Sequence, residues 1–339
     1  MRKKDLKASI DKAVKIRRTL QPLHEAFLPL LLVAVSSTAA LLILIINKYI
    51  FPFGHTLLAP MLGHIIVLLV PTYIFLQITS YGTSPKALFD ELGFHKIGAD
   101  HIFFLVFSSL FMISTSFVMN TLFYGVYKAS EGFNLLGIFT AGGEEYTVSL
   151  PYLIIVYALV PAIIEEFMLR GVIFTSLSKI SSEIAIVGSA LLSAILSFTI
   201  GGFPAAAFCA LTYCFVRYIT GSVISCMIVH FAFNLYGLFL QTNLSKYLVS
   251  QQNNLLLLTV TLSVWLICCA LFFAECSHIF RTKSKRIHEG EEKSKIRGFD
   301  IKKLKNQGLS ILSHVPSLVC AAVCVVMFIA VTVIGIINM

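Results

Sequence analysis

Long apolar runs separated by short polar stretches dominate the chain from residue 27 onward. A membrane-spanning helix needs ~20 predominantly apolar residues, because the hydrocarbon core is ~30 Å thick and a helix rises ~1.5 Å per residue. Nine segments are candidates by this measure: 27–47, 56–78, 102–127, 150–178, 183–200, 203–219, 221–240, 255–279 and 311–337. The segment 203–219 is the shortest and is compatible with a re-entrant helix. The pattern predicts an all-α fold, a polytopic transmembrane helical bundle of eight or nine spans.

The composition supports this fold class. Hydrophobic residues make up 57% of the chain and charged residues only 13%, about half the share that is usual in soluble domains. The mean hydropathy is +0.87. A water-soluble enzyme and a nucleic-acid-binding protein are therefore excluded. The first apolar run is longer than the ~7–15 residues of a signal-peptide core and more spans follow it, so we expect it to be retained as a span.

The net charge of +9 is explained by topology. Eight of the 26 basic residues lie in 1–26 and ten lie in 281–305, and the positive-inside rule assigns both segments to the cytosol. We therefore expect a cytosolic N-terminus and, after a ninth span, a C-terminus outside. The expected organisation is a basic cytosolic segment 1–26, N-terminal transmembrane helices 27–148, a core 149–241, and C-terminal transmembrane helices 242–339 with a basic cytosolic loop 279–310. Residues 84–97 have the pattern of a short amphipathic helix at the membrane interface.

The most unusual polar residues lie in the middle of the apolar stretch 150–178, in the sequence Pro161-Ala-Ile-Ile-Glu-Glu-Phe-Met-Leu-Arg-Gly171. An ionisable side chain inside a bilayer is costly, so such a residue is a functional candidate by default. Glu166 and Arg170 are four residues apart and can form an ion pair on one helix face. Glu165 lies ~100° away around the helix. We expect Arg170 to neutralise Glu166, leaving Glu165 free to act as a general base.

A second polar pair occurs on a later apolar helix. His230 and Asn234 are also four residues apart, and together they offer hydrogen-bond donors that can stabilise a developing oxyanion. Other polar residues in the spans carry weaker signals. We interpret His64 as a hydrogen-bonding residue between helices, and we expect Arg217, near the end of its span, to extend its charged group toward the interface.

The motifs together resemble the CPBP family of intramembrane proteases, which includes the type II CAAX prenyl endopeptidases and the bacterial Abi proteins. The matching features are Glu-Glu-x-x-x-Arg at 165–170, the turn Arg217-Tyr-Ile-Thr-Gly-Ser222 and His-x-x-x-Asn at 230–234. They fall within residues 150–240. The order and spacing of the motifs, rather than any single one, carry the resemblance.

The resemblance implies an endopeptidase in which Glu165 activates water for attack on a peptide bond. Glu166 and Arg170 would support Glu165, while His230 and Asn234 would stabilise the oxyanion. The substrate would be a peptide or a lipidated protein tail that is associated with the membrane. The composition and the apolar runs predict a multi-pass membrane protein, in contact with membrane lipids and with no nucleic-acid partner. With the resemblance, we expect its location to be the bacterial plasma membrane.

One family motif is altered in this chain. The family carries Phe-x-x-x-His between the two other motifs, and here the corresponding residues are Phe198 and Gly202. No histidine occurs between Arg170 and His230, so a shift of the alignment does not restore it. A zinc site would lack a ligand, and we predict no metal or other cofactor. A histidine from elsewhere in the fold, such as His64, would restore the missing partner if it lay beside Glu165.

The altered motif leaves three hypotheses open. The first is an active endopeptidase of the CPBP type. The second is a catalytically inactive relative with the same fold, which would serve as a scaffold or regulator of another membrane protein. The third is a transporter of protons or a small solute, since buried glutamate, arginine and histidine side chains also suit such a pathway.

Overall fold

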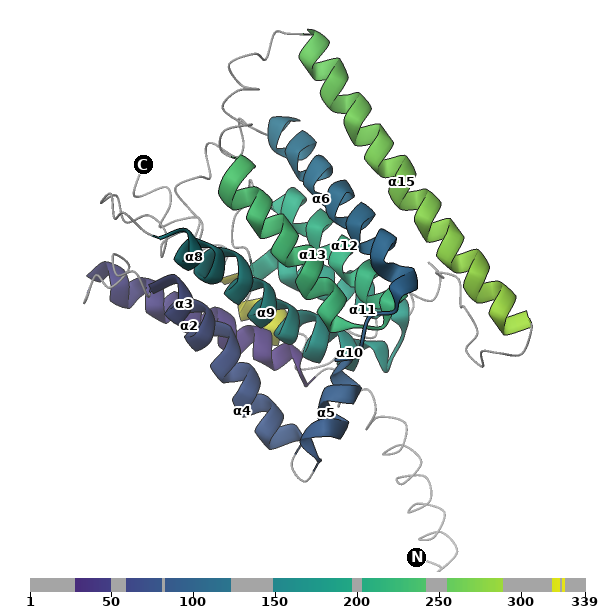
Figure 1. The fold of residues 1–339 in the computed structure, drawn as a ribbon. Helices are drawn as coiled ribbons and strands as arrows, with labels where there is room; N and C mark the ends of the chain where they lie inside the picture. The colour runs from purple at the N-terminus through teal and green to yellow at the C-terminus, as the bar shows by residue number, and fades with distance from the viewer. Residues whose placement is uncertain are drawn as a thin grey trace, which may run out of the picture.

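The computed structural model describes residues 28–49, 59–80, 83–122, 149–196, 203–241, 255–288, 319–323 and 325–326. Helices account for nearly all of these residues, and the described part of the chain contains no β-strand (Figure 1). The predicted all-α fold is confirmed.

Six helical segments of the described residues are long and apolar enough to cross a membrane: Met61–Thr79, Ala99–Met119, Leu150–Ser178, Phe203–Thr220, Val223–Leu240 and Thr259–Thr282. The chain is therefore an integral membrane protein. The predicted count of eight or nine spans is not confirmed. Of the other predicted spans, 183–200 forms a shorter apolar helix, Ser182–Leu196, and 27–47 contributes the apolar stretch Leu30–Ala40. Most of 311–337 lies outside the described residues.

The centre of the bundle is formed by the helices of residues 150–236. The continuous helical segment 150–178 contains α9 (Val160–Glu166) and α10 (Phe174–Ser178). It is followed by α11 (Ser182–Leu196), α12 (Phe203–Thr220) and α13 (Val223–Tyr236). Helix α11 packs against α10 and α12, and α13 packs against α9 and α12.

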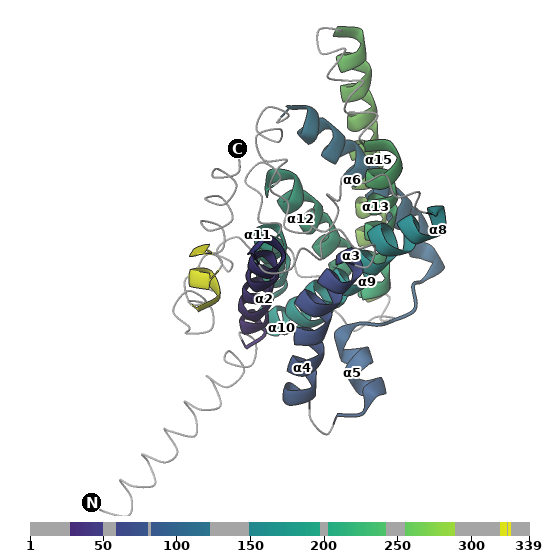
Figure 2. The same ribbon diagram turned by 90° about the vertical axis from the view of Figure 1, so that its left-hand side faces the viewer.

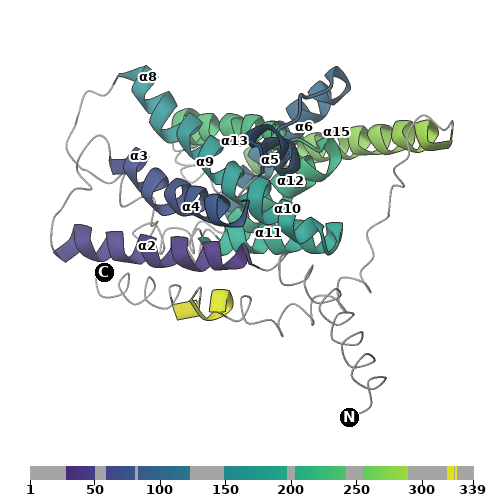
Figure 3. The same ribbon diagram turned by 90° about the horizontal axis from the view of Figure 1, so that it is seen from below.

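The other helices surround this centre. On one side lie α2 (Leu30–Tyr49), α3 (Ala59–His64) and α4 (Val70–Thr79), and α3 packs against α9. On the other side, α6 (Ile102–Leu122) packs against α12 and α13 (Figure 2). The long helix α15 (Leu255–His288) lies beside α6 at the edge of the bundle and extends away from it when seen from below (Figure 3). Its last residues lie within the basic segment that begins at 279.

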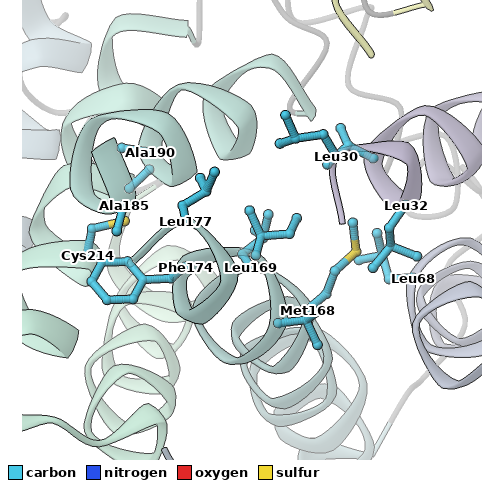
Figure 4. Close-up of a cluster of buried hydrophobic side chains, with 14 of the residues drawn as sticks. Leu30, Leu32, Leu68, Met168, Leu169, Phe174, Leu177, Ala185, Ala190 and Cys214 are labelled. Carbon is cyan, nitrogen blue, oxygen red and sulfur yellow. The ribbon is translucent and has the colours of Figure 1, made fainter. Parts of the chain in front are cut away.

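Two clusters of buried apolar side chains hold these helices together. In the first cluster, side chains of α2 meet those that follow Glu166 in the chain, including Met168 and Leu169, and the cluster continues to α11 and α12 (Figure 4). The second cluster joins α6, α12, α13 and α15, with Phe111 and Phe272 stacked at a centroid distance of 4.4 Å. The polar residues of α9 and α13 are therefore held between two packed apolar regions.

Two prolines account for local widening of the helices near the polar residues. A proline has no N–H to donate, and its ring clashes with the carbonyl four residues earlier, so the helix before it is disturbed. Pro161 follows the π-helical segment η5 (Ile154–Leu159), and Pro71 follows the π-helical segment η2 (Ile65–Leu69). A third π-helical segment, η6 (Phe167–Ile173), begins directly after Glu166. Such segments are frequent at functional sites.

The amphipathic segment predicted at 84–97 contains a helix, α5 (Pro85–Leu92), that lies near α4 at one end of the bundle (Figures 1 and 2). The Ser84 hydroxyl accepts a hydrogen bond from the Ala87 N–H at its start, and Gly93 ends it in a left-handed conformation with φ +87°. The helix is shorter than the amphipathic pattern, because Gly93 turns the chain back toward the bundle.

Candidate functional site

The two adjacent glutamates at the end of α9 have different environments. The Glu166 side chain is fully buried, whereas the Glu165 side chain is 23% exposed. Adjacent residues of a helix point ~100° apart, so only one of the two side chains can face the packed region between α9, α12 and α13. The expectation that the two carboxylates lie on different faces is confirmed.

Glu166 accepts two interactions through one oxygen. Its Oε1 atom lies 3.1 Å from Arg170 Nη1 and 2.9 Å from His230 Nδ1. The predicted ion pair between Glu166 and Arg170 is therefore confirmed, and the structure adds His230 to it. Glu166 and Arg170 are both almost completely buried, and an unpaired buried charge is costly. The ion pair with Arg170 compensates the negative charge of Glu166 inside the protein.

Arg170 makes further contacts around Glu166 and His230, and Tyr213 packs against both Arg170 and His230. Arg170 also donates to the backbone carbonyl of Ala210 at 3.1 Å and to the Ser193 hydroxyl at 3.5 Å. Its guanidinium lies 5.1 Å from the ring centre of Tyr213, and the same ring stacks on His230 at 4.8 Å. The His230 ring is thus held from two directions, by the hydrogen bond to Glu166 at its edge and by the Tyr213 ring at its face.

Glu165 has a different partner, which comes from a distant part of the chain. The Nε2 atom of His64 lies 3.3 Å from Glu165 Oε1, and His64 is 6% exposed. His64 is the last residue of α3 and directly precedes η2. The interpretation of His64 as a residue that hydrogen-bonds between helices is correct. Its partner is Glu165, the glutamate for which the altered motif at Gly202 supplies no histidine.

His230 and Asn234 lie on α13 as the sequence indicates, but they bind different groups. The Asn234 side-chain amide donates to the backbone carbonyl of Ala158 at 3.2 Å, whereas His230 faces Glu166. The two donors therefore do not share one acceptor.

The remaining predicted site residues, Phe198 and Gly202, lie outside the described residues. Among the residues that are described, no group of three or more His, Cys, Asp and Glu side chains is arranged to hold a metal ion. The described polar site consists instead of two carboxylate–histidine contacts, Glu165 with His64 and Glu166 with His230, and one arginine.

Sequence reasoning missed the role of Arg217. The expectation that its charged group extends toward the interface is wrong, because Arg217 is 8% exposed. Its guanidinium donates to the backbone carbonyls of Arg170, Leu92 and Gly221. These acceptors belong to segments far apart in the sequence, so the residue pattern gave no signal beyond the Arg-x-x-Thr-Gly-Ser turn itself.

The fold and the site together define a helical membrane protein with a carboxylate, histidine and arginine cluster at the centre of its bundle. The family model described as "Type II CAAX prenyl endopeptidase Rce1-like" matches residues 147–236. This segment contains Glu165, Glu166, Arg170, His230 and Asn234, and the resemblance to the CPBP family is confirmed for it. No curated protein and no solved structure matches the chain.

Proposed function

We propose that the protein is a membrane endopeptidase of the CAAX-protease type, in which Glu165 activates the attacking water. The observation that carries the proposal is the difference between the two glutamates. Glu166 is fully buried and is bonded through Oε1 to Arg170 and His230, whereas Glu165 is partly exposed and has a histidine beside it. A general base must be reachable by water and substrate, and the 23% exposure of Glu165 makes it the better candidate of the two carboxylates.

His64 is the proposed partner of Glu165. The atom that faces the carboxylate is Nε2, so the tautomer that carries its proton on Nε2 donates to Glu165 Oε1. This hydrogen bond orients the carboxylate and leaves its other oxygen for water. His64 thereby fills the place that the family motif gives to a histidine at the position of Gly202.

The proposed reaction is hydrolysis of a peptide bond. Glu165 takes a proton from water while the water oxygen bonds to the carbonyl carbon, which produces a tetrahedral intermediate with a negative oxygen. The C–N bond then breaks, and the leaving amine takes the proton from Glu165. The products are a carboxylic acid and an amine, and the glutamate returns to its starting state.

His230 and Asn234 are the proposed donors for the negative oxygen. Each would donate through an N–H group that its observed hydrogen bond does not use. His230 uses Nδ1 for Glu166, so it can donate to substrate only through Nε2 and only as the imidazolium. Asn234 uses one N–H for Ala158 and has a second N–H on the same amide. Removing one oxyanion donor typically costs ~10²–10³ in kcat.

The substrate class follows from the family match and from the membrane setting. We propose a membrane-associated peptide, and specifically a prenylated tail, because the matching family is that of the Rce1-like type II CAAX prenyl endopeptidases. A prenyl chain would partition into the bilayer beside the apolar helices and bring the peptide to the depth of Glu165.

Cleavage by the full-length protein in phospholipid liposomes tests the proposal. The probes are a quenched fluorescent peptide that ends in a farnesylated C-a-a-X sequence and the same peptide without the farnesyl group. We expect cleavage of the farnesylated probe and a loss of ~10²-fold or more for Glu165→Gln. A folded parent protein that cleaves neither probe, or a Glu165→Gln variant that cleaves at the parental rate, would contradict the proposal.

A further inference from the structure

Arg217 connects three separate segments of the protein through backbone acceptors. Its Nε atom donates to the carbonyl of Arg170 at 3.3 Å and its Nη2 atom donates to the carbonyl of Leu92 at 3.1 Å, while Nη1 donates to the carbonyl of Gly221. Leu92 is the last residue of α5, and Gly221 directly follows α12. Carbonyls at helix C-termini carry partial negative charge, so these acceptors stabilise the buried guanidinium.

The bond to Arg170 leads directly to the proposed catalytic residues. Arg170 lies in η6, the segment that begins after Glu166, and its side chain binds Glu166. In turn, Glu166 binds His230. A continuous series of contacts therefore runs from Leu92 through Arg217 and Arg170 to the helix end that carries Glu165.

The loop that follows α5 also contacts the beginning of α13, the helix that carries His230. The Val223 N–H donates to the carbonyl of Gly93 at 2.9 Å, and the Ser222 hydroxyl donates to the carbonyl of His95 at 2.7 Å. The loop 93–95 is thus bonded to the start of α13, and Leu92 before it is bonded to Arg217. The same short stretch of chain is therefore bonded both to Arg217 on α12 and to the start of the helix that carries His230.

Gly93 makes the close approach of Arg217 possible. A Cβ atom at this position would lie 1.9 Å from Arg217 Nη2, which is far inside any allowed contact. The backbone of Gly93 also has φ +87°, a conformation that side chains disfavour. Gly221 has a similar φ of +68°, but a Cβ atom there would meet nothing within 4 Å.

We propose that Arg217 and residues 92–95 act as a bracket that holds the Glu165 end of α9 and the His230 helix in register, which makes Arg217 a positioning residue for the site. The proposal rests on the proposed function, because it assigns Arg217 an effect on the chemical step. Arg217 reaches the site only through other residues, so its loss changes the placement of Glu165 and His230 and removes no contact with substrate.

Replacement of Arg217 tests this role through the kinetics of the farnesylated probe. We expect Arg217→Met to lower kcat by ~10²-fold, since a displacement of about 1 Å can cost that much, with KM changed by less than about twofold. Arg217→Lys keeps the charge but not the planar fork of donors, and we expect an intermediate kcat. An Arg217→Met variant with parental kcat per folded molecule would overturn the proposal.

The two left-handed glycines provide a matched pair of variants. Gly93→Ala and Gly221→Ala introduce the same side chain into a similar backbone conformation, so the backbone strain is similar. Only Gly93→Ala also displaces the Arg217 guanidinium. We expect Gly93→Ala to lower kcat by ~10-fold or more relative to Gly221→Ala. Equal kcat values for the two variants would overturn the proposal.

A distance measurement separates this proposal from the proposed function. Spin labels attached through unnatural amino acids at the exposed residues Lys86, on α5, and Ser178, at the end of α10, report whether α5 stays docked. We expect the distance distribution to broaden in Arg217→Met and Gly93→Ala and to remain parental in Gly221→Ala. An unchanged distribution in Arg217→Met would overturn the bracket. Failure of the parent to cleave peptide would overturn the proposed function without affecting this measurement.

Discussion

His64 Nε2 lies 3.3 Å from Glu165 Oε1, although 101 residues separate the two in the sequence. This contact supplies a histidine to the glutamate that the family motif pairs with one, from a helix outside the matching segment 147–236. The contribution of this contact to catalysis can be measured by removing His64 and by placing a histidine at position 202 instead.

We expect His64→Ala to lower the rate of cleavage of the farnesylated peptide by ~10²–10⁴-fold, the usual effect of removing a general acid or base partner. The double variant His64→Ala/Gly202→His should recover part of this loss, because it returns a histidine to the family motif. A double variant that is no faster than His64→Ala would show that the motif position no longer reaches Glu165. The single variant Gly202→His is the control.

The two glutamates should differ in their effect on stability. Glu166→Gln leaves the buried Arg170 without its carboxylate, and breaking a buried ion pair costs about 3–5 kcal/mol. Glu165→Gln affects a carboxylate that is partly exposed and has no arginine partner among the described residues, so we expect a smaller change. Unfolding of both variants in the same detergent micelles measures the difference. Equal destabilisation would contradict the assignment of Glu166 as the buried, structural carboxylate.

Tyr213 should tolerate loss of its hydroxyl but not of its ring. The hydroxyl is buried and has no hydrogen-bond partner among the described residues, and leaving a buried hydroxyl unpaired costs about 1–3 kcal/mol. Tyr213→Phe keeps the stacking on His230 and the contact with Arg170, so we expect stability equal to or above that of the parent. Tyr213→Leu removes both aromatic contacts and should be less stable than Tyr213→Phe. A destabilised Tyr213→Phe variant would reveal a role for the hydroxyl.

Pro161 should affect activity more than stability. Without the proline, the π-helical segment η5 has no remaining steric cause, and a regular helix in its place would rotate α9 relative to α8 (Leu150–Leu153). We expect Pro161→Ala to lower cleavage while the protein unfolds at the same or a higher temperature, because alanine is the better helix former. Circular dichroism during heating and the peptide assay measure the two effects. Parental cleavage by a folded Pro161→Ala variant would contradict this prediction.

The local part of the site was predictable from the sequence. The pairing of Glu166 with Arg170 follows from helical spacing alone, and so does the separation of Glu165 from Glu166 around the helix. The all-α fold follows from the long apolar runs. These properties depend on residues within a few positions of one another, where periodicity determines geometry.

The tertiary part of the site was not predictable in the same way. The contact between His64 and Glu165 and the bonds from Arg217 to Arg170 and Leu92 join residues that are between 47 and 125 positions apart. The π-helical segments add a further difficulty, because they break the 3.6-residue period on which face assignments depend. His230 and Asn234 show the limit: helical spacing places them on one helix, but it gives no indication of their partners Glu166 and Ala158, which come from another part of the chain.

The position of His64 on α3 has a consequence for how the molecule can be divided. Residues 147–236 carry every recognisable family motif, but the histidine beside Glu165 and the loop that anchors Arg217 both come from earlier in the chain. A fragment cut at the family boundaries would keep the motifs and lose two of the contacts that shape them. The contacts that shape the site therefore extend beyond the segment of recognisable homology, back at least to His64 on α3.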